Sequence, residues 1–242
     1  MLLLIYLHSV AGVGWRVQDI YQGGTIPDMA RTSKMPRYEE FNKADNAYGP
    51  RAQEPKSWVT KLDPEIPLNL ELGCGKAEVT LALAQKYPDE NFIGVDLKAD
   101  RLWRASLNAK DLHLDNVAFI QANILSLEEF IRPQTVKMIW LTHPDPYPKD
   151  RQAKHRMLNR NFLDIYKKVL QPGGIVRLKT DNHDLFVWAK ELLSEQQDIE
   201  VMRSLDDLHK DSADEDLLIE TTFTQKYIAV GTPISYLEFH FR

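Results

Sequence analysis

The strongest constraint on the fold is the alternation of short apolar runs with longer amphipathic stretches between residues 68 and 194. The apolar runs predict strands, and the stretches between them space their apolar residues as helices do. Repeated βα units form parallel sheets, so we predict an α/β fold with a mostly parallel sheet and helices on both faces. The predicted strands are 68–72, 91–96, 117–121, 136–141 and 174–179. The predicted helices are 78–86, 100–112, 127–130, 158–170 and 184–194.

The two ends of the chain depart from this pattern. Beyond residue 197, segments 199–203 and 235–241 alternate apolar and polar residues with period two, which predicts an antiparallel hairpin at one sheet edge. We expect one domain over 68–242, a lead-in segment over 29–67, and a non-native or disordered extension over 1–28. Met29 would then be the natural start, and the alternative for 1–28 is a short extra helix. The apolar run MLLLIYL is too short to span a membrane, so we expect no membrane association.

Composition narrows the class of protein. The 242 residues include a single cysteine, Cys74, which excludes a disulfide framework and a thiolate zinc site and fits a reducing cytoplasm. The net charge of -5 argues against a nucleic-acid binder that is basic overall. A local basic patch meets that objection. It comprises Lys149, Arg151, Lys154, His155, Arg156 and Arg160.

A glycine turn follows the first predicted strand in LELGCGKAEV. Gly73 and Gly75 allow a tight turn and the close approach of a ligand, as in dinucleotide-binding folds. A dehydrogenase would have a third glycine where this chain has Glu78, and the Glu71 carboxylate would repel a pyrophosphate. S-adenosylmethionine carries a sulfonium and an ammonium group instead, so an acidic residue beside the loop attracts it. The loop therefore favours S-adenosylmethionine as cofactor.

Polar residues also end the next two strands. Asp96 can accept hydrogen bonds from both ribose hydroxyls, and Asn123 can offer its amide to the adenine edge. The alternatives are structural: Asp96 could cap the following helix, and Asn123 could be a turn residue.

The segment HPDPYPKD, residues 143–150, follows the fourth predicted strand. Its prolines exclude both helix and ladder strand and predict a stiff, extended loop. We expect this loop to hold Asp145 and Lys149 toward ligands, and the alternative is a proline turn in which Asp145 only caps the backbone. His143 and Asp145 alone are too few ligands for a metal, and we predict none.

Together these motifs resemble the bacterial tRNA (guanine-N7-)-methyltransferases, which have a Rossmann-like fold and use S-adenosylmethionine. The resemblance rests on ELGCGKAE, HPDPYPKDRQAKHR, LQPGGIVRLKTDN and TTFTQKYIAVGTPI, and covers residues 68 to the end. Thr224 stands where that family has a glutamate, and Gln152 where it usually has a histidine. The resemblance implies cofactor contact by Glu71, Asp96, Asn123 and Asp145, and substrate contact by Lys149, Asp181, Thr221 and Thr224. From the basic patch, Arg151 and Lys154 are added as substrate-binding residues.

The implied activity is transfer of a methyl group to N7 of a guanine in the tRNA variable loop. N7 carries an exposed lone pair, so no base is needed, and Asp145 is the expected catalytic residue. The alternatives are a small-molecule methyltransferase and an inactive RNA-binding protein. We expect tRNA as the partner, with a monomer or homodimer in the cytoplasm and no obligate protein partner.

Overall fold

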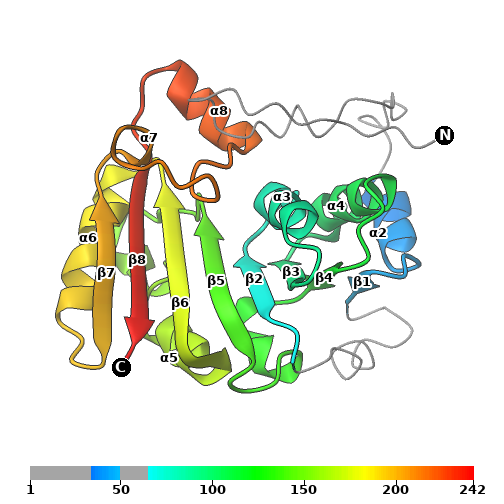
Figure 1. The fold of residues 1–242 in the computed structure, drawn as a ribbon, viewed down its shortest axis with the longest axis horizontal. Helices are drawn as coiled ribbons and strands as arrows, with labels where there is room; N and C mark the ends of the chain where they lie inside the picture. Colours follow the sequence, from blue (N-terminus) through cyan, green and yellow to red (C-terminus); the bar gives the residue numbers. More distant parts are fainter. Residues whose placement is uncertain (1–33, 50–64) are drawn as a thin grey trace.

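The computed structural model of the protein describes residues 34–49 and 65–242. In this part of the chain, eight strands form one sheet in the order β1-β4-β3-β2-β5-β6-β8-β7. Neighbouring strands are parallel from β1 to β6, and β8 is antiparallel to both β6 and β7 (Figure 1). The predicted mostly parallel sheet with an antiparallel C-terminal edge is confirmed.

The strands are β1 (Ala47–Tyr48), β2 (Leu68–Leu72), β3 (Asn91–Asp96), β4 (Val117–Gln121), β5 (Val136–Thr142), β6 (Leu170–Thr180), β7 (Ile199–Leu205) and β8 (Ser235–Phe241). The α-helices are α2 (Lys34–Phe41), α3 (Glu78–Lys86), α4 (Ala99–Asp111), α5 (Arg160–Val169), α6 (His183–Ser194), α7 (Leu208–Asp211) and α8 (Thr222–Ala229). Two 3-10 helices are η2 (Ile124–Glu129) and η3 (Asp150–His155).

Most predicted elements agree with the structure to within a few residues, and β6 departs most. We expected a helix through residue 170 and a strand from 174, but α5 ends at Val169 and the strand begins at Leu170. Leu170 pairs with Val136, and the register then shifts before β6 continues at Ile175. A Cβ on Gly174 would lie only 3.0 Å from the carbonyl oxygen of Val136. Glycine therefore lets the irregular strand stay close to β5.

The helices cover both faces of the sheet, as predicted, because the strands alternate their side chains. In β5, Ile139 and Leu141 join a core with α5 and α6, whereas Met138 and Trp140 face the core formed with α3 and α4. This is the period of two that a strand with two covered faces requires.

The lead-in segment contributes two elements that the sequence reading did not predict. Helix α2 packs on α4, where the indole Nε1 of Trp103 donates to Glu40 at 2.6 Å. Strand β1 pairs with β4 at one sheet edge. Residues 34–49 thus share the core of the domain, whereas the predicted extension 1–28 lies outside the described residues. Among the helices described, none has the length and apolarity needed to cross a bilayer.

The chain direction across the sheet places the candidate site. After β2 the chain runs outward through β3 and β4, then returns to the other side of β2 as β5 and continues to β6. The switch point between β2 and β5, outside the carboxyl ends of the strands, is where open α/β sheets bind ligands. Helix α8 lies above the ends of β5 and β6 on this side (Figure 1).

Candidate active site

The glycine loop after β2 has the backbone conformation that its sequence predicts. Gly73 and Gly75 have φ angles of 71° and 57°, in the left-handed region that glycine adopts without strain. The Gly73 and Cys74 amides donate to the carbonyl of Val95 at 2.8 and 3.1 Å, which ties the loop to the end of β3. A Cβ on Gly75 would meet no heavy atom within 4 Å, so the loop has an open side.

Asp96 lies directly against this loop. Its carboxylate accepts hydrogen bonds from the Gly75 amide at 2.9 Å and from the Lys98 amide at 2.8 Å, and Arg101 lies 3.9 Å away. The carboxylate therefore organises the turn into α4, although the helix cap itself is Lys98. Two backbone donors leave part of its acceptor capacity for a ligand.

The Glu71 carboxylate contacts helix α3. It is buried, and its Oε2 accepts from both the amide and the hydroxyl of Thr80, at 2.9 and 2.6 Å. Burial raises the pKa of Glu71 to about 7, and the hydrogen bonds from Thr80 offset this only in part. In this state Glu71 stabilises the start of α3, and its contact with a cofactor stays a prediction.

Asn123 begins η2 at the end of β4. Its Oδ1 accepts from the Leu125 amide at 3.0 Å, so the turn interpretation describes its carbonyl oxygen correctly. The side chain is exposed, and among the described residues its amide nitrogen has no hydrogen-bond partner. The carbonyl oxygen of Asn123 thus shapes the turn, while its amide nitrogen stays available to a ligand.

The proline loop after β5 is neither helix nor strand, as predicted. His143 and Tyr147 both have left-handed backbones, with φ angles of 48° and 45°. For residues other than glycine this costs roughly 1–2 kcal/mol each, so the surrounding contacts must hold them. Asp145 lies between them with an exposed side chain that forms no hydrogen bond or ion pair within the described ranges. The loop thus presents one unpaired carboxylate to solvent.

Arg156 holds this loop in place, and its assignment to the basic patch was wrong. Its guanidinium donates to the carbonyl of Pro146 at 3.1 Å and to that of Tyr147 at 3.1 and 3.3 Å. It also lies 4.6 Å from the ring centre of Trp188, and the residue is only 8% exposed. The sequence alone does not show that Arg156 is buried, because the direction of its side chain depends on the turn of η3. The other patch residues, Lys149, Arg151, Lys154, His155 and Arg160, are exposed.

A second polar group joins the end of β6 to α8. The Nδ1 of His143 lies 2.8 Å from Oδ1 of Asp181, and its Nε2 lies 2.9 Å from Oγ1 of Thr224. Burial alone would raise the pKa of Asp181, but hydrogen bonds with His143 and Tyr227 outweigh this effect and lower it. The sequence suggests for His143 only the role of a metal ligand. Its two partners are 38 and 81 residues away, so no local pattern could have revealed them.

The segment before α8 is anchored on both sides. The fully buried Lys179 donates to the carbonyl of Ile219 at 2.8 Å, and burial lowers the pKa of Lys179 to about 7. The Thr222 amide donates to Glu78 at 2.8 Å. These contacts connect the tail to β6 and to the helix that follows the glycine loop.

Thr221 and Thr224 are both buried. The Thr221 hydroxyl caps α8 by accepting from the Thr224 amide at 3.1 Å, and the two hydroxyl oxygens are 3.0 Å apart. Their expected contact with substrate stays a prediction.

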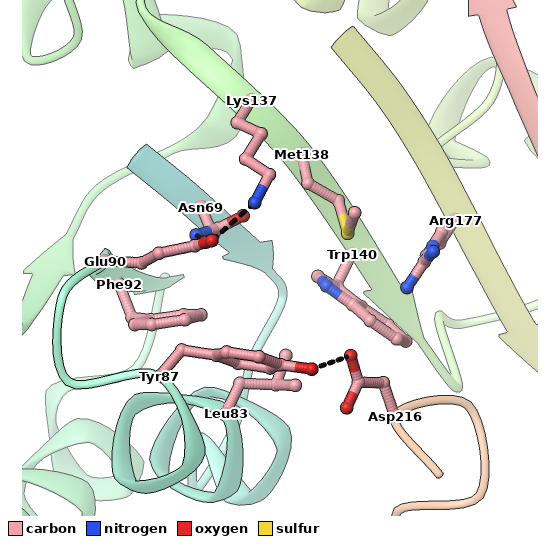
Figure 2. Close-up of a pocket in the computed structure, with 10 residues that line it drawn as sticks. All are labelled: Asn69, Leu83, Tyr87, Glu90, Phe92, Lys137, Met138, Trp140, Arg177 and Asp216. Atoms are coloured by element: carbon pink, nitrogen blue, oxygen red, sulfur yellow. Dashed lines mark hydrogen bonds and ion pairs between the residues drawn. The ribbon is translucent and has the colours of Figure 1, made fainter. Parts of the chain in front are cut away.

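A cavity of about 150 Å³ lies elsewhere, near the amino-terminal ends of β2, β3 and β5. Figure 2 shows that its polar side chains pair with one another: Glu90 with Asn69 and Lys137, and Tyr87 with Asp216. The hydrogen bond between Tyr87 and Asp216 tethers the loop around Asp216 to the end of α3. The cavity is separate from the carboxyl edge of the sheet.

The chain is similar to proteins named as methyltransferases. A family model described as "Putative methyltransferase" matches residues 65–237. The tRNA (guanine-N(7)-)-methyltransferase of Cytophaga hutchinsonii is 37% identical over 219 residues, 88% of this chain and 99% of that protein. The enzyme of the same name from Christiangramia forsetii is 37% identical over 222 residues, covering 87% and 99%.

Among solved structures, the 16S rRNA methyltransferase KamB has a TM-score of 0.55 at 14% identity, covering 75% of this chain and 89% of that one. At this identity KamB supports the fold alone, which is the Rossmann-like methyltransferase fold that the sequence predicted. The sequence matches over nearly the full length of the relatives go further. The chain belongs to the tRNA (guanine-N7-)-methyltransferase family and is an enzyme of this type.

Proposed function

We propose that this enzyme transfers the methyl group of S-adenosylmethionine to N7 of a guanine in the tRNA variable loop. The observation that carries the proposal is the row of polar groups along the carboxyl edge of neighbouring strands. From β4 to β6 this row reads Asn123, Asp96, the glycine loop, Asp145 and Asp181. A cofactor would lie across β4, β3 and β2, and the acceptor base across β5 and β6, so the two meet at the switch point.

The residues near the glycine loop fit S-adenosylmethionine. Gly75 faces open space, Asp96 retains acceptor capacity for ribose hydroxyls, and the Asn123 amide can donate to adenine. The unpaired Asp145 can attract the positively charged end of the cofactor, and Glu71 would add to this attraction if it turned from Thr80. When bound, the cofactor supplies a methyl group on a cationic sulfur.

The reaction requires mainly that the protein align guanine N7 with the methyl group of the cofactor. Guanine N7 has a free lone pair, so no residue has to remove a proton before methyl transfer. Fixing two reactants in line can contribute about 7–11 kcal/mol, and the strained proline loop tied down by Arg156 is suited to that role. The ring becomes positive as the methyl group arrives. Asp145 can stabilise this charge, while Asp181 accepts from the N–H groups of guanine.

The exposed basic residues supply the contact with RNA. Lys149 can donate to guanine O6 or to a phosphate, and Arg151 and Lys154 extend the positive surface along η3. This segment lies next to the glycine loop, because a Cβ on Gly73 would be 3.4 Å from the sulfur of Met157 just beyond η3. A tRNA held there has its acceptor guanine near the switch point. We propose that the enzyme acts in the cytoplasm as a monomer or homodimer without an obligate protein partner.

The test is methyl transfer from labelled S-adenosylmethionine to unmodified tRNA transcripts, with the product nucleosides identified by mass spectrometry. We expect 7-methylguanosine in the intact transcript and none when the variable-loop guanine is replaced. Transfer to another position would contradict the assigned site. Binding of tRNA without binding of the cofactor would favour an inactive RNA-binding protein. Transfer to small molecules alone would favour the small-molecule alternative.

A further inference from the structure

The buried imidazole of His143 has no place in the function described so far. We propose that His143 is a positioning residue for the acceptor guanine, holding the Asp181 carboxylate so that it accepts from the N1–H and the 2-amino group. This inference rests on the proposed function and adds a residue and a specificity mechanism to it.

The backbone places the imidazole in the gap between β6 and α8. The His143 amide donates to the carbonyl of Lys179 at 2.8 Å, two residues before Asp181. The φ angle of 48° is one that glycine or asparagine adopts more readily than histidine. A histidine kept in a strained conformation implies that its side chain is used. That side chain is 6% exposed and lies beside the ring of Tyr227, with centres 5.5 Å apart.

The hydrogen bonds fix the proton on one ring nitrogen, and the neutral ring satisfies the rest of the network. An ionised carboxylate only accepts, so the Nδ1 that faces Asp181 carries the proton. In the neutral ring, Nε2 then accepts from the hydroxyl of Thr224, whose oxygen accepts in turn from Thr221. Thr221 completes the chain by accepting from the Thr224 amide. Both ring nitrogens are occupied, so the imidazole cannot rotate without breaking two hydrogen bonds.

The fixed carboxylate matches the donor edge of guanine. The Asp181 side chain is 22% exposed, so part of the carboxylate stays accessible while His143 and Tyr227 hydrogen-bond to it. Guanine presents N–H donors at N1 and at its 2-amino group, whereas adenine has an acceptor at N1. As N7 becomes methylated the ring turns positive and its N1–H becomes a better donor. The contact therefore strengthens in the transition state and should appear mainly in kcat.

Three substitutions of His143 and one control test this role. His143→Phe keeps a planar ring without donors, and His143→Gln moves the amide toward Thr224, so both should lower kcat on the order of 10- to 100-fold. His143→Asn places an amide nitrogen near the position of Nδ1 and tolerates the left-handed backbone, so it should recover activity to within about fivefold of the unaltered enzyme. The KM for S-adenosylmethionine should not change. His113→Phe is the matched control, because exposed His113 also has a left-handed backbone, with φ 54°.

A base substitution separates positioning from a purely structural role. Replacing the acceptor guanosine by inosine removes the 2-amino group and should slow the unaltered enzyme about tenfold. In the His143→Phe variant, or in His143→Gln if the first does not fold, the same replacement should cost less than about threefold. Equal losses, or an asparagine variant as slow as phenylalanine, would overturn the role of His143. Full activity of His143→Phe would overturn only the role of His143 and leave the proposed function intact. No transfer by the unaltered enzyme would overturn the proposed function as well.

Discussion

Arg156 offers the sharpest test of the structure, because its sequence context suggests RNA binding while its contacts are internal. In Arg156→Lys the positive charge is kept but the fork that reaches both Pro146 and Tyr147 is lost. One charge-assisted hydrogen bond contributes about 1.5–3 kcal/mol, and the stacking on Trp188 about 1 kcal/mol more. We therefore expect the free energy of unfolding to fall by about 2.5–4 kcal/mol.

Urea denaturation and thermal unfolding measure this loss directly. For a chain of this size, 1 kcal/mol corresponds to roughly 2–4 °C in Tm, so the variant should melt on the order of 10 °C lower. Arg151→Lys is the matched control and should stay within about 0.5 kcal/mol, because Arg151 is exposed on the same segment. Equal stability of the two variants would refute the anchoring role.

Three further predictions concern the site. Asp145→Ala should abolish methyl transfer with an unchanged Tm, whereas Asp150→Asn, an exposed change nearby, should keep activity; normal turnover of the first variant would rule out its catalytic role. Lys149→Ala should leave kcat largely intact and lower the slope of log Kd against log salt by about one, and an unchanged slope would exclude a phosphate contact. Burial raises the pKa of Glu71 from 4.5 to about 7. As the pH rises through this range, the unfolded chain releases the Glu71 proton before the folded protein does, so the free energy of unfolding falls. Glu71→Gln should therefore gain stability over the unaltered protein between pH 4.5 and 7, by up to about 3 kcal/mol, and parallel stability curves would contradict this.

The sequence predicted the elements whose signals are local. Strands β2, β3, β4 and β8 have the predicted bounds, because apolar runs in the first three, period-two alternation in β8 and flanking turn residues all occupy a few consecutive positions. The glycine loop was equally accessible, since Gly73 and Gly75 directly report left-handed backbone. Elements of weak or short pattern were missed. Helix α8 and the two-residue strand β1 depend on packing against the rest of the fold.

The side-chain roles were harder to predict than the elements. Its charge alone predicts that Arg156 is exposed like its neighbours, yet it is buried, with three hydrogen bonds to two carbonyls and a contact with Trp188. Nothing near His143 in the chain indicates that it bridges Asp181 and Thr224, because hydrogen-bond partners distant in sequence leave no local periodicity.

By itself, the sequence determined the α/β class and the row of polar residues at the strand ends, because these follow from residue type and short-range spacing, and its motifs carried the resemblance to the family. Only the tertiary structure decided which of those residues face solvent and which support one another. Burial and hydrogen bonding depend on segments brought together from 38 to 81 residues apart, and it is this assembly that leaves Asp145 exposed and holds Asp181 in place.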